Sequence, residues 1–133
     1  MPQKMNNKTT HFEIYGNEPA KLAEFYVGLF GWKLEKAPGV DYWRIHTGAG
    51  NSARVDGGVT YRPSYAPLGW LQYVSVDSID RTIAEAERMG ASVLLPKTAI
   101  PKTGWYAVLA DPQSNAFAIW QADPTAFPMP MPG

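Results

Sequence analysis

The stretch that decides the fold is THFEIYGNEPAKLAEFYVGLFG, residues 10–31. Its first seven residues alternate, which predicts a strand with His11, Glu13 and Tyr15 on one face. An apolar stripe at helical spacing follows between residues 22 and 29, and the closing glycine supplies a stop. This stretch therefore predicts a strand followed by an amphipathic helix.

The same pattern recurs 60 residues later, where residues 71–90 read LQYVSVDSIDRTIAEAERMG. Strand-like segments broken by Gly and Pro follow each helix, at 32–36, 42–47 and 58–62 and then at 92–95, 105–109 and 116–121. The chain thus predicts an α+β fold of two tandem βαβββ modules, 10–63 and 70–123. We expect curled mixed sheets with the helices outside and a central cavity that holds a ligand.

Composition excludes several classes of protein. The 133 residues include no cysteine, which rules out disulfides, thiolate zinc sites and cysteine nucleophiles. Twelve Lys and Arg balance twelve Asp and Glu without a basic cluster, so we expect no nucleic-acid partner. No apolar run is long enough for a membrane span, and residues 1–9 lack the apolar stretch of a signal peptide. We therefore expect a cytoplasmic protein with one domain, 10–123, between a polar N-terminal tail and a Pro-rich tail at 124–133.

The order and spacing of these motifs resemble the glyoxalase / bleomycin-resistance / extradiol-dioxygenase superfamily, also called vicinal oxygen chelate proteins. The resemblance rests on the H-x-E-x-Y opening at His11, the Phe-Tyr pair at residues 25–26 and the second-helix segment 75–93. It also rests on DPQSNAFAIW at 111–120, where Ser114 replaces a glycine of the family's turn. The resemblance covers about residues 10–122 and implies the glyoxalase-like fold.

The superfamily's chemistry depends on a metal held by His and Glu side chains from four strands. Carried over one position at a time, these ligands fall on His11, Gly58, Leu71 and Ala118. Only His11 carries a donor atom, so we expect no metal and no other cofactor. The alternative is a divalent metal held by His11 with displaced ligands, for example His46 and Glu13.

Other candidate residues follow from the alternating faces and from an aromatic content of 13%. His11 and Glu13 are the candidates for metal-free acid–base chemistry. A carboxylate–arginine ion pair, with Arg44 or Arg62, is the structural explanation for Glu13. Large rings alternate with small residues on faces that we expect to point inward, Trp120 with Ala118 and Trp105 with Ala107 and Leu109. We predict that the ligand contacts Tyr15, Arg44, Tyr61, Tyr73, Trp105 and Trp120.

Three functions remain open at this stage. The first is a protein that binds a small apolar or aromatic molecule without an intact metal centre, as the bleomycin-resistance branch of the superfamily implies. The second is an enzyme, a lyase, isomerase or dioxygenase that uses a metal at His11 or metal-free chemistry by Glu13 and His11. The third is an interaction module that has lost the pocket. The resemblance also implies a homodimer.

Overall fold

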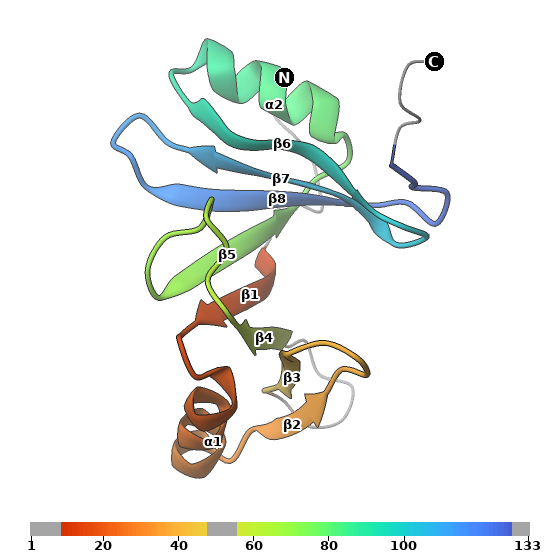
Figure 1. Ribbon diagram of the computed structural model, residues 1–133. Coiled ribbons are helices and arrows are strands. Elements are labelled where there is room, and N and C mark those ends of the chain that lie inside the picture. Colours follow the sequence, from red (N-terminus) through yellow and green to blue (C-terminus); the bar gives the residue numbers. More distant parts are fainter. Residues whose placement is uncertain (1–8, 48–55, 129–133) are drawn as a thin grey trace. The chain divides into compact units, whose positions relative to one another are not determined.

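The computed structural model describes residues 9–47 and 56–128, which form an α+β fold. They divide into two compact units, the first ending at Gln72 and the second beginning at Tyr73. Each unit contains one helix, which lies on one side of its strands (Figure 1). The predicted fold class, two βαβββ modules, is confirmed.

The first module contains one helix and four strands, β1 (Thr9–Tyr15), α1 (Pro19–Phe30), β2 (Lys33–Lys36), β3 (Tyr42–His46) and β4 (Asp56–Thr60). Its strands lie in the order β2-β3-β4-β1, with β1 parallel to β4 and the other pairs antiparallel. A core fills the space between α1 and the sheet: Phe12, Ile14, Ala23, Ile45 and Val59. Since these strand residues point toward the helix, their neighbours in sequence point to the other face of the sheet.

The second module repeats the pattern with β5 (Trp70–Ser75), α2 (Ile79–Arg88), β6 (Ser92–Ile100), β7 (Gly104–Ala110) and β8 (Ala116–Ala122). Its strand order is β5-β8-β7-β6, with β5 parallel to β8. Its core under α2 consists of Val76, Ile79, Ala107, Leu109 and Ile119. The edge strand β6 is longer than predicted because shifts of register on both sides of Leu95 accommodate Pro96.

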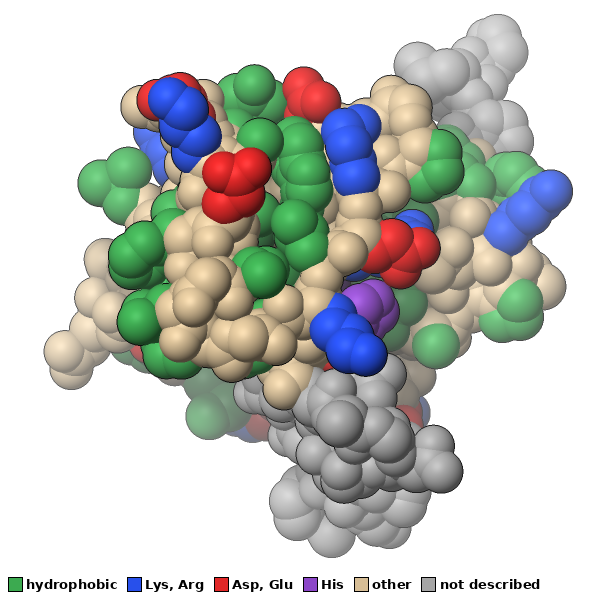
Figure 2. Space-filling view, turned by 90° about the horizontal axis from the view of Figure 1, so that it is seen from below, with side chains coloured by type: hydrophobic (Ala, Val, Ile, Leu, Met, Phe, Trp, Pro, Cys, Tyr) green, Lys and Arg blue, Asp and Glu red, His purple; other side chains and the backbone are tan. Residues whose placement is uncertain are grey.

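Helix α1 buries a narrower stripe than its sequence predicts. Pro19 and Ala23 are buried, whereas Phe25 and Leu29 are 57% and 60% exposed. Two larger residues of the stripe, Leu22 and Tyr26, are partly buried against the core under the helix. Figure 2 shows hydrophobic side chains at the surface among charged ones.

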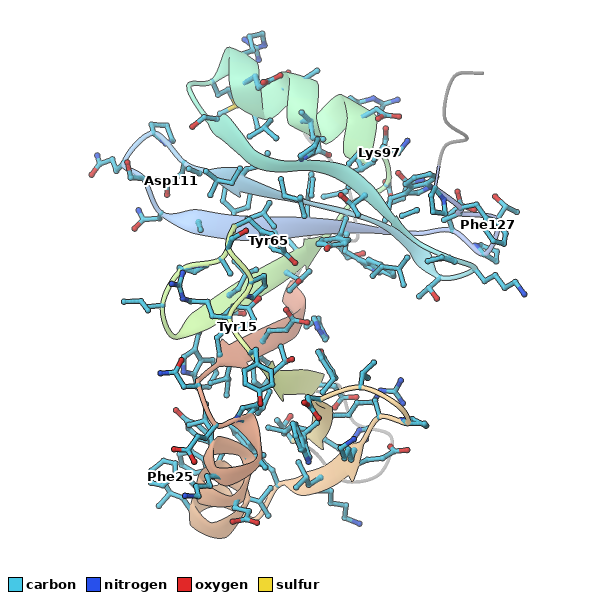
Figure 3. All side chains as sticks on the ribbon, viewed as in Figure 1. Tyr15, Phe25, Tyr65, Lys97, Asp111 and Phe127 are labelled. Carbon is cyan, nitrogen blue, oxygen red and sulfur yellow. The ribbon has the colours of Figure 1, made fainter. Side chains whose placement is uncertain are left out.

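The turn between β7 and β8 departs from the family pattern at one position. Ser114 has a φ of 70°, the left-handed conformation that favours glycine. Asp111, labelled in Figure 3, accepts hydrogen bonds from the backbone N–H groups of Gln113 and Asn115 at 2.8 and 3.0 Å. The turn therefore retains its side-chain cap with serine in place of glycine.

Part of the Pro-rich tail packs on the second module. The side chain of Ala126 is fully buried, and its carbonyl accepts a hydrogen bond of 2.8 Å from the Lys102 backbone N–H. Within residues 124–128 the buried side chain is that of Ala126, whereas Phe127 is 52% exposed. The remaining five residues of the tail lie outside the described residues.

Candidate functional site

Each sheet has one face covered by its helix and an opposite face that we call the open face. The open face of the first module is polar, because the alternation of β1, β3 and β4 turns its apolar residues toward α1. It carries His11, Glu13, Tyr15, Tyr42, Arg44, His46, Asp56, Gly58 and Thr60. The three candidates from the opening strand therefore lie together on one face, as predicted.

A partly buried carboxylate organises this open face. Tyr15 donates a hydrogen bond of 2.7 Å to Oε1 of Glu13, and Tyr42 donates one of 3.0 Å to Oε2. Nε2 of His11 lies 3.4 Å from the Tyr42 hydroxyl and 3.7 Å from Glu13 Oε2. We call these four residues the Glu13 group. The Glu13 side chain is only 15% exposed, so its charge is stabilised by these neighbours rather than mainly by water.

The surroundings of Glu13 favour its ionised form. Burial by itself would raise the pKa of this carboxyl, but hydrogen bonds from His11, Tyr15 and Tyr42 and the charge of His11 together lower the pKa. For Tyr42 burial, followed by the negative charge of Glu13, raises the pKa of the phenol. Tyr42 is therefore a proton-bearing donor and Glu13 an ionised acceptor at neutral pH.

Tyr42 was not among the residues predicted for the site, and it reaches Glu13 because of a glycine. Glu13 and Gly58 are paired across β1 and β4, and Tyr42 lies on the next strand. A Cβ at Gly58 would overlap the Tyr42 phenol, so the absence of a side chain makes room for this ring. The one sequence signal was a Gly-Gly pair inside a strand, which indicates a close approach by another group.

The four positions carried over from the family do not suit a metal. Gly58, Leu71 and Ala118 have no side-chain donor atom, and the Tyr42 ring lies over Gly58. Within residues 9–47 and 56–128 no group of three or more His, Asp or Glu side chains is placed to hold a metal ion.

His46, the residue offered for a displaced metal site, has other partners. Its Nε2 lies 3.4 Å from Glu35 and its Nδ1 lies 3.5 Å from Asp56. The alternative triad of His11, His46 and Glu13 is therefore not assembled in the described part of the chain.

The two arginines proposed as structural partners of Glu13 lie at different places in the first module. Arg62 lies beyond the end of β4 and donates a hydrogen bond of 3.0 Å to the carbonyl of Ala66. Arg44 is exposed on β3, in the position paired with Gly58. Tyr61, a predicted ligand contact, also lies beyond β4 and is 52% exposed.

The open face of the second module is apolar and aromatic. Tyr73 pairs with Ala118 across β5 and β8, and Trp120 pairs with Tyr106 across β8 and β7. The rings of Tyr73 and Tyr106 have centroids 6.3 Å apart. A Cβ at Gly104 would meet the six-membered ring of Trp120 at 2.5 Å, so this indole lies over the glycine.

Trp105 is on the opposite side of the same sheet, which corrects the expectation that it points inward with Trp120. It packs with Ala107 and Leu109 against the core under α2, because these three alternate residues of β7 share the helix-covered face. Its indole N–H donates to Asp123 at 3.1 Å, and Lys97 lies over its ring at 4.4 Å. Figure 3 labels Lys97 on β6. Trp105 therefore has a structural role in the second module.

The fold and the two open faces define an α+β protein built from duplicated βαβββ modules. The sequence model of the family described as Glyoxalase-like domain matches residues 13–120. The chain therefore belongs to the glyoxalase-like family, as the sequence resemblance indicates.

Curated relatives agree with this assignment. A proposed glyoxylase, CFP32 of Mycobacterium bovis, is 32% identical over 115 residues, covering 84% of this chain and 43% of the relative. The anthracycline biosynthesis protein DnrV of Streptomyces peucetius is 28% identical over 124 residues, covering 83% of this chain and 45% of the relative. The chain thus spans less than half the length of these relatives.

Solved structures share the fold. A glyoxalase/bleomycin resistance protein/dioxygenase superfamily member from Vibrio splendidus has a TM-score of 0.57 at 15% identity, over 84% of this chain and 96% of that one. None of the helices within the described ranges is long and apolar enough to cross a membrane.

Proposed function

We propose that this glyoxalase-like protein binds a small apolar or aromatic molecule without the help of a metal centre. The observation that carries the proposal is the open face of the second module, where Trp120 lies over Gly104 beside Tyr106 and Tyr73. Indole and phenol rings give a flat ligand a large contact area at a small cost in conformational entropy. An aromatic ligand also accords with the name of the relative DnrV, since anthracyclines contain fused aromatic rings.

The small residues of this face favour a ligand rather than a filled core. Ala118 lies between Tyr73 and Val108 in the sheet, and Gly104 lies beneath the Trp120 indole. Small side chains next to large rings leave a step in the surface where a ring can stack.

An enzymatic function is the second candidate, and it rests on the 3.7 Å separation of His11 and Glu13. Because the pKa of Glu13 is lowered, its carboxylate is a weaker base than an ordinary glutamate. In a metal-free isomerase or lyase the neutral form of His11 would accept the proton and Glu13 would orient the imidazole. If His11 has such a role, the protein should show turnover and His11→Ala should abolish it. A protein that only binds its ligand should show no turnover in either form.

The contact with Trp120 can be tested by calorimetric titration with 1-hydroxyanthraquinone as an aromatic probe. We expect Trp120→Phe to weaken binding about ten-fold, because part of the stacking surface is lost. The matched control is Trp105→Phe, which changes the same residue type on the helix-covered face and should leave the affinity within about two-fold. Equal losses in the two variants, or none in either, would place the aromatic site elsewhere.

Metal content is expected to be far below one equivalent after purification without chelator and incubation with nickel, zinc, manganese and iron. The physical reason is that Gly58, Leu71 and Ala118 lack donor atoms. Elemental analysis of the protein and of His11→Ala provides the measurement. One equivalent of metal in the first and none in the second would contradict a metal-free function and support the enzyme.

A further inference from the structure

The open face of the second module carries no charged side chain within the part of the chain that the structure describes. The strand registers place these residues on it: Tyr73 and Ser75 of β5, Ser92, Leu95, Thr98 and Ile100 of β6, Gly104, Tyr106, Val108 and Ala110 of β7, and Ala116, Ala118, Trp120 and Ala122 of β8. The polar side-chain groups among them are hydroxyls and the indole N–H of Trp120. A hydroxyl can donate and accept hydrogen bonds, but it supplies no counter-ion.

The charged residues of this module lie on its other surfaces. Six of them belong to α2 or to the segment that leads into it: Asp77, Asp80, Arg81, Glu85, Glu87 and Arg88. Lys97, labelled in Figure 3, is on the helix-covered side, where its ammonium lies 3.0 Å from Asp80 and 4.4 Å from the centroid of the Trp105 ring. Asp111 caps the turn between β7 and β8.

Two further charges, of opposite sign, flank the end of the sheet where Trp120 lies over Gly104. Lys102 is in the turn before β7 and is exposed, so its attraction for an anion acts through water and is weak. Asp123 follows β8, and its carboxylate accepts hydrogen bonds from the Trp105 indole at 3.1 Å and from the Thr125 hydroxyl at 2.6 Å. Neither residue provides a desolvated partner for an ion bound over the face.

We propose that the aromatic site on this face selects uncharged ring compounds and disfavours the same ring system carrying a carboxylate or an ammonium group. The inference rests on the proposed function, because it names the charge state of the aromatic ligand. An ion that leaves water to lie on the face loses hydration without gaining an ion pair, whereas a hydroxyl exchanges its hydrogen bonds with water for bonds with other hydroxyls. The penalty applies to both signs, since the described residues of the face include no charge of either sign.

The test compares three naphthalenes that share a ring system: 2-naphthol, 2-naphthoate and 2-naphthylmethylammonium. At pH 7 the first is neutral, the second is an anion and the third is a cation. We expect titration calorimetry to show that naphthol binds about ten-fold or more tightly than either ion, because the desolvation of each ion is uncompensated. Equal or tighter binding of either ion would overturn this inference and leave an aromatic binding protein in place.

A lysine designed into the face supplies the missing counter-ion. Ala122 is exposed at the end of β8 and pairs with Gly104, over which the Trp120 indole lies. Ala122→Lys should therefore tighten the binding of naphthoate about three-fold or more and leave the cation bound no more tightly than before.

The matched control is Ala116→Lys, which introduces the same charge on the same face of β8, about 20 Å away along the strand. It should leave the affinity for naphthoate within about two-fold, because an exposed charge at this distance is screened. Equal effects of the two substitutions, or none at Ala122, would contradict the placement of the ligand beside Trp120.

The outcome for the anthraquinone probe separates this inference from the proposed function. If the probe binds and no naphthalene does, anthraquinone-2-carboxylate replaces naphthoate in the comparison, and the same ten-fold difference decides. If neither the probe nor any naphthalene binds, the proposed function fails and this inference fails with it.

Discussion

Replacing Gly58 by alanine is expected to lower the free energy of unfolding by about 2–3 kcal/mol. The physical reason is direct overlap, because a Cβ at this position would occupy the space of the Tyr42 phenol. Either the ring moves away from Glu13 or the strand shifts, and both outcomes lose the hydrogen bond between Tyr42 and Glu13. Urea unfolding of the variant and the unmodified protein measures the effect.

A double-mutant cycle separates this overlap from a general intolerance of alanine in β4. In a Tyr42→Ala background the ring is absent, so Gly58→Ala should cost about 1 kcal/mol or less. The difference between the two backgrounds is the coupling between the glycine and the tyrosine. An unchanged cost in the Tyr42→Ala background would contradict the close approach of the two residues.

The neighbouring Gly57→Ala substitution is expected to cost about 3 kcal/mol, because it introduces a methyl group into a closed core. Three atoms of the Phe12 ring lie within 2.7 Å of the position that a Cβ at Gly57 would take. Phe12 is itself buried at 5% exposure and stacks on Trp70 at a centroid distance of 5.1 Å. The ring therefore has little room to give way.

Gly28→Ala is the matched control for this prediction. Gly28 lies inside α1, where a Cβ would meet nothing within 4 Å, so alanine should stabilise the helix by up to about 1 kcal/mol. Thermal and urea unfolding of both variants give the comparison. Similar stabilities for the two variants would show that Phe12 does not confine Gly57.

Much of the site on β1 could be predicted from sequence alternation. A strand has a period of two, so the H-x-E-x-Y opening placed His11, Glu13 and Tyr15 on one face without any knowledge of the fold. The same alternation puts Tyr42, Arg44 and His46 on one face of β3, but it does not indicate which strand lies next to β3. Tyr42 was missed for this reason, since its contact with Glu13 spans 29 residues.

The error at Trp105 has a related origin. Alternation divides the residues of β7 into two sets, and it does not say which set faces α2. Trp105, Ala107 and Leu109 share a face as predicted, and the core under α2 forms on that face. The apolar stripe also did not predict which residues of α1 are buried. Ala23, rather than Phe25, is the residue that approaches the sheet.

The sequence by itself determined the order of the elements, the duplication and the two faces of each strand, since these depend on local periodicity and on turn residues. Only the tertiary structure decided that Tyr42 lies over Gly58 and directs its hydroxyl to Glu13, and that Trp120 lies over Gly104. Both arrangements depend on pairing between strands and on space left by a missing side chain. Such complementarity is a property of three-dimensional packing and leaves little trace in a single sequence.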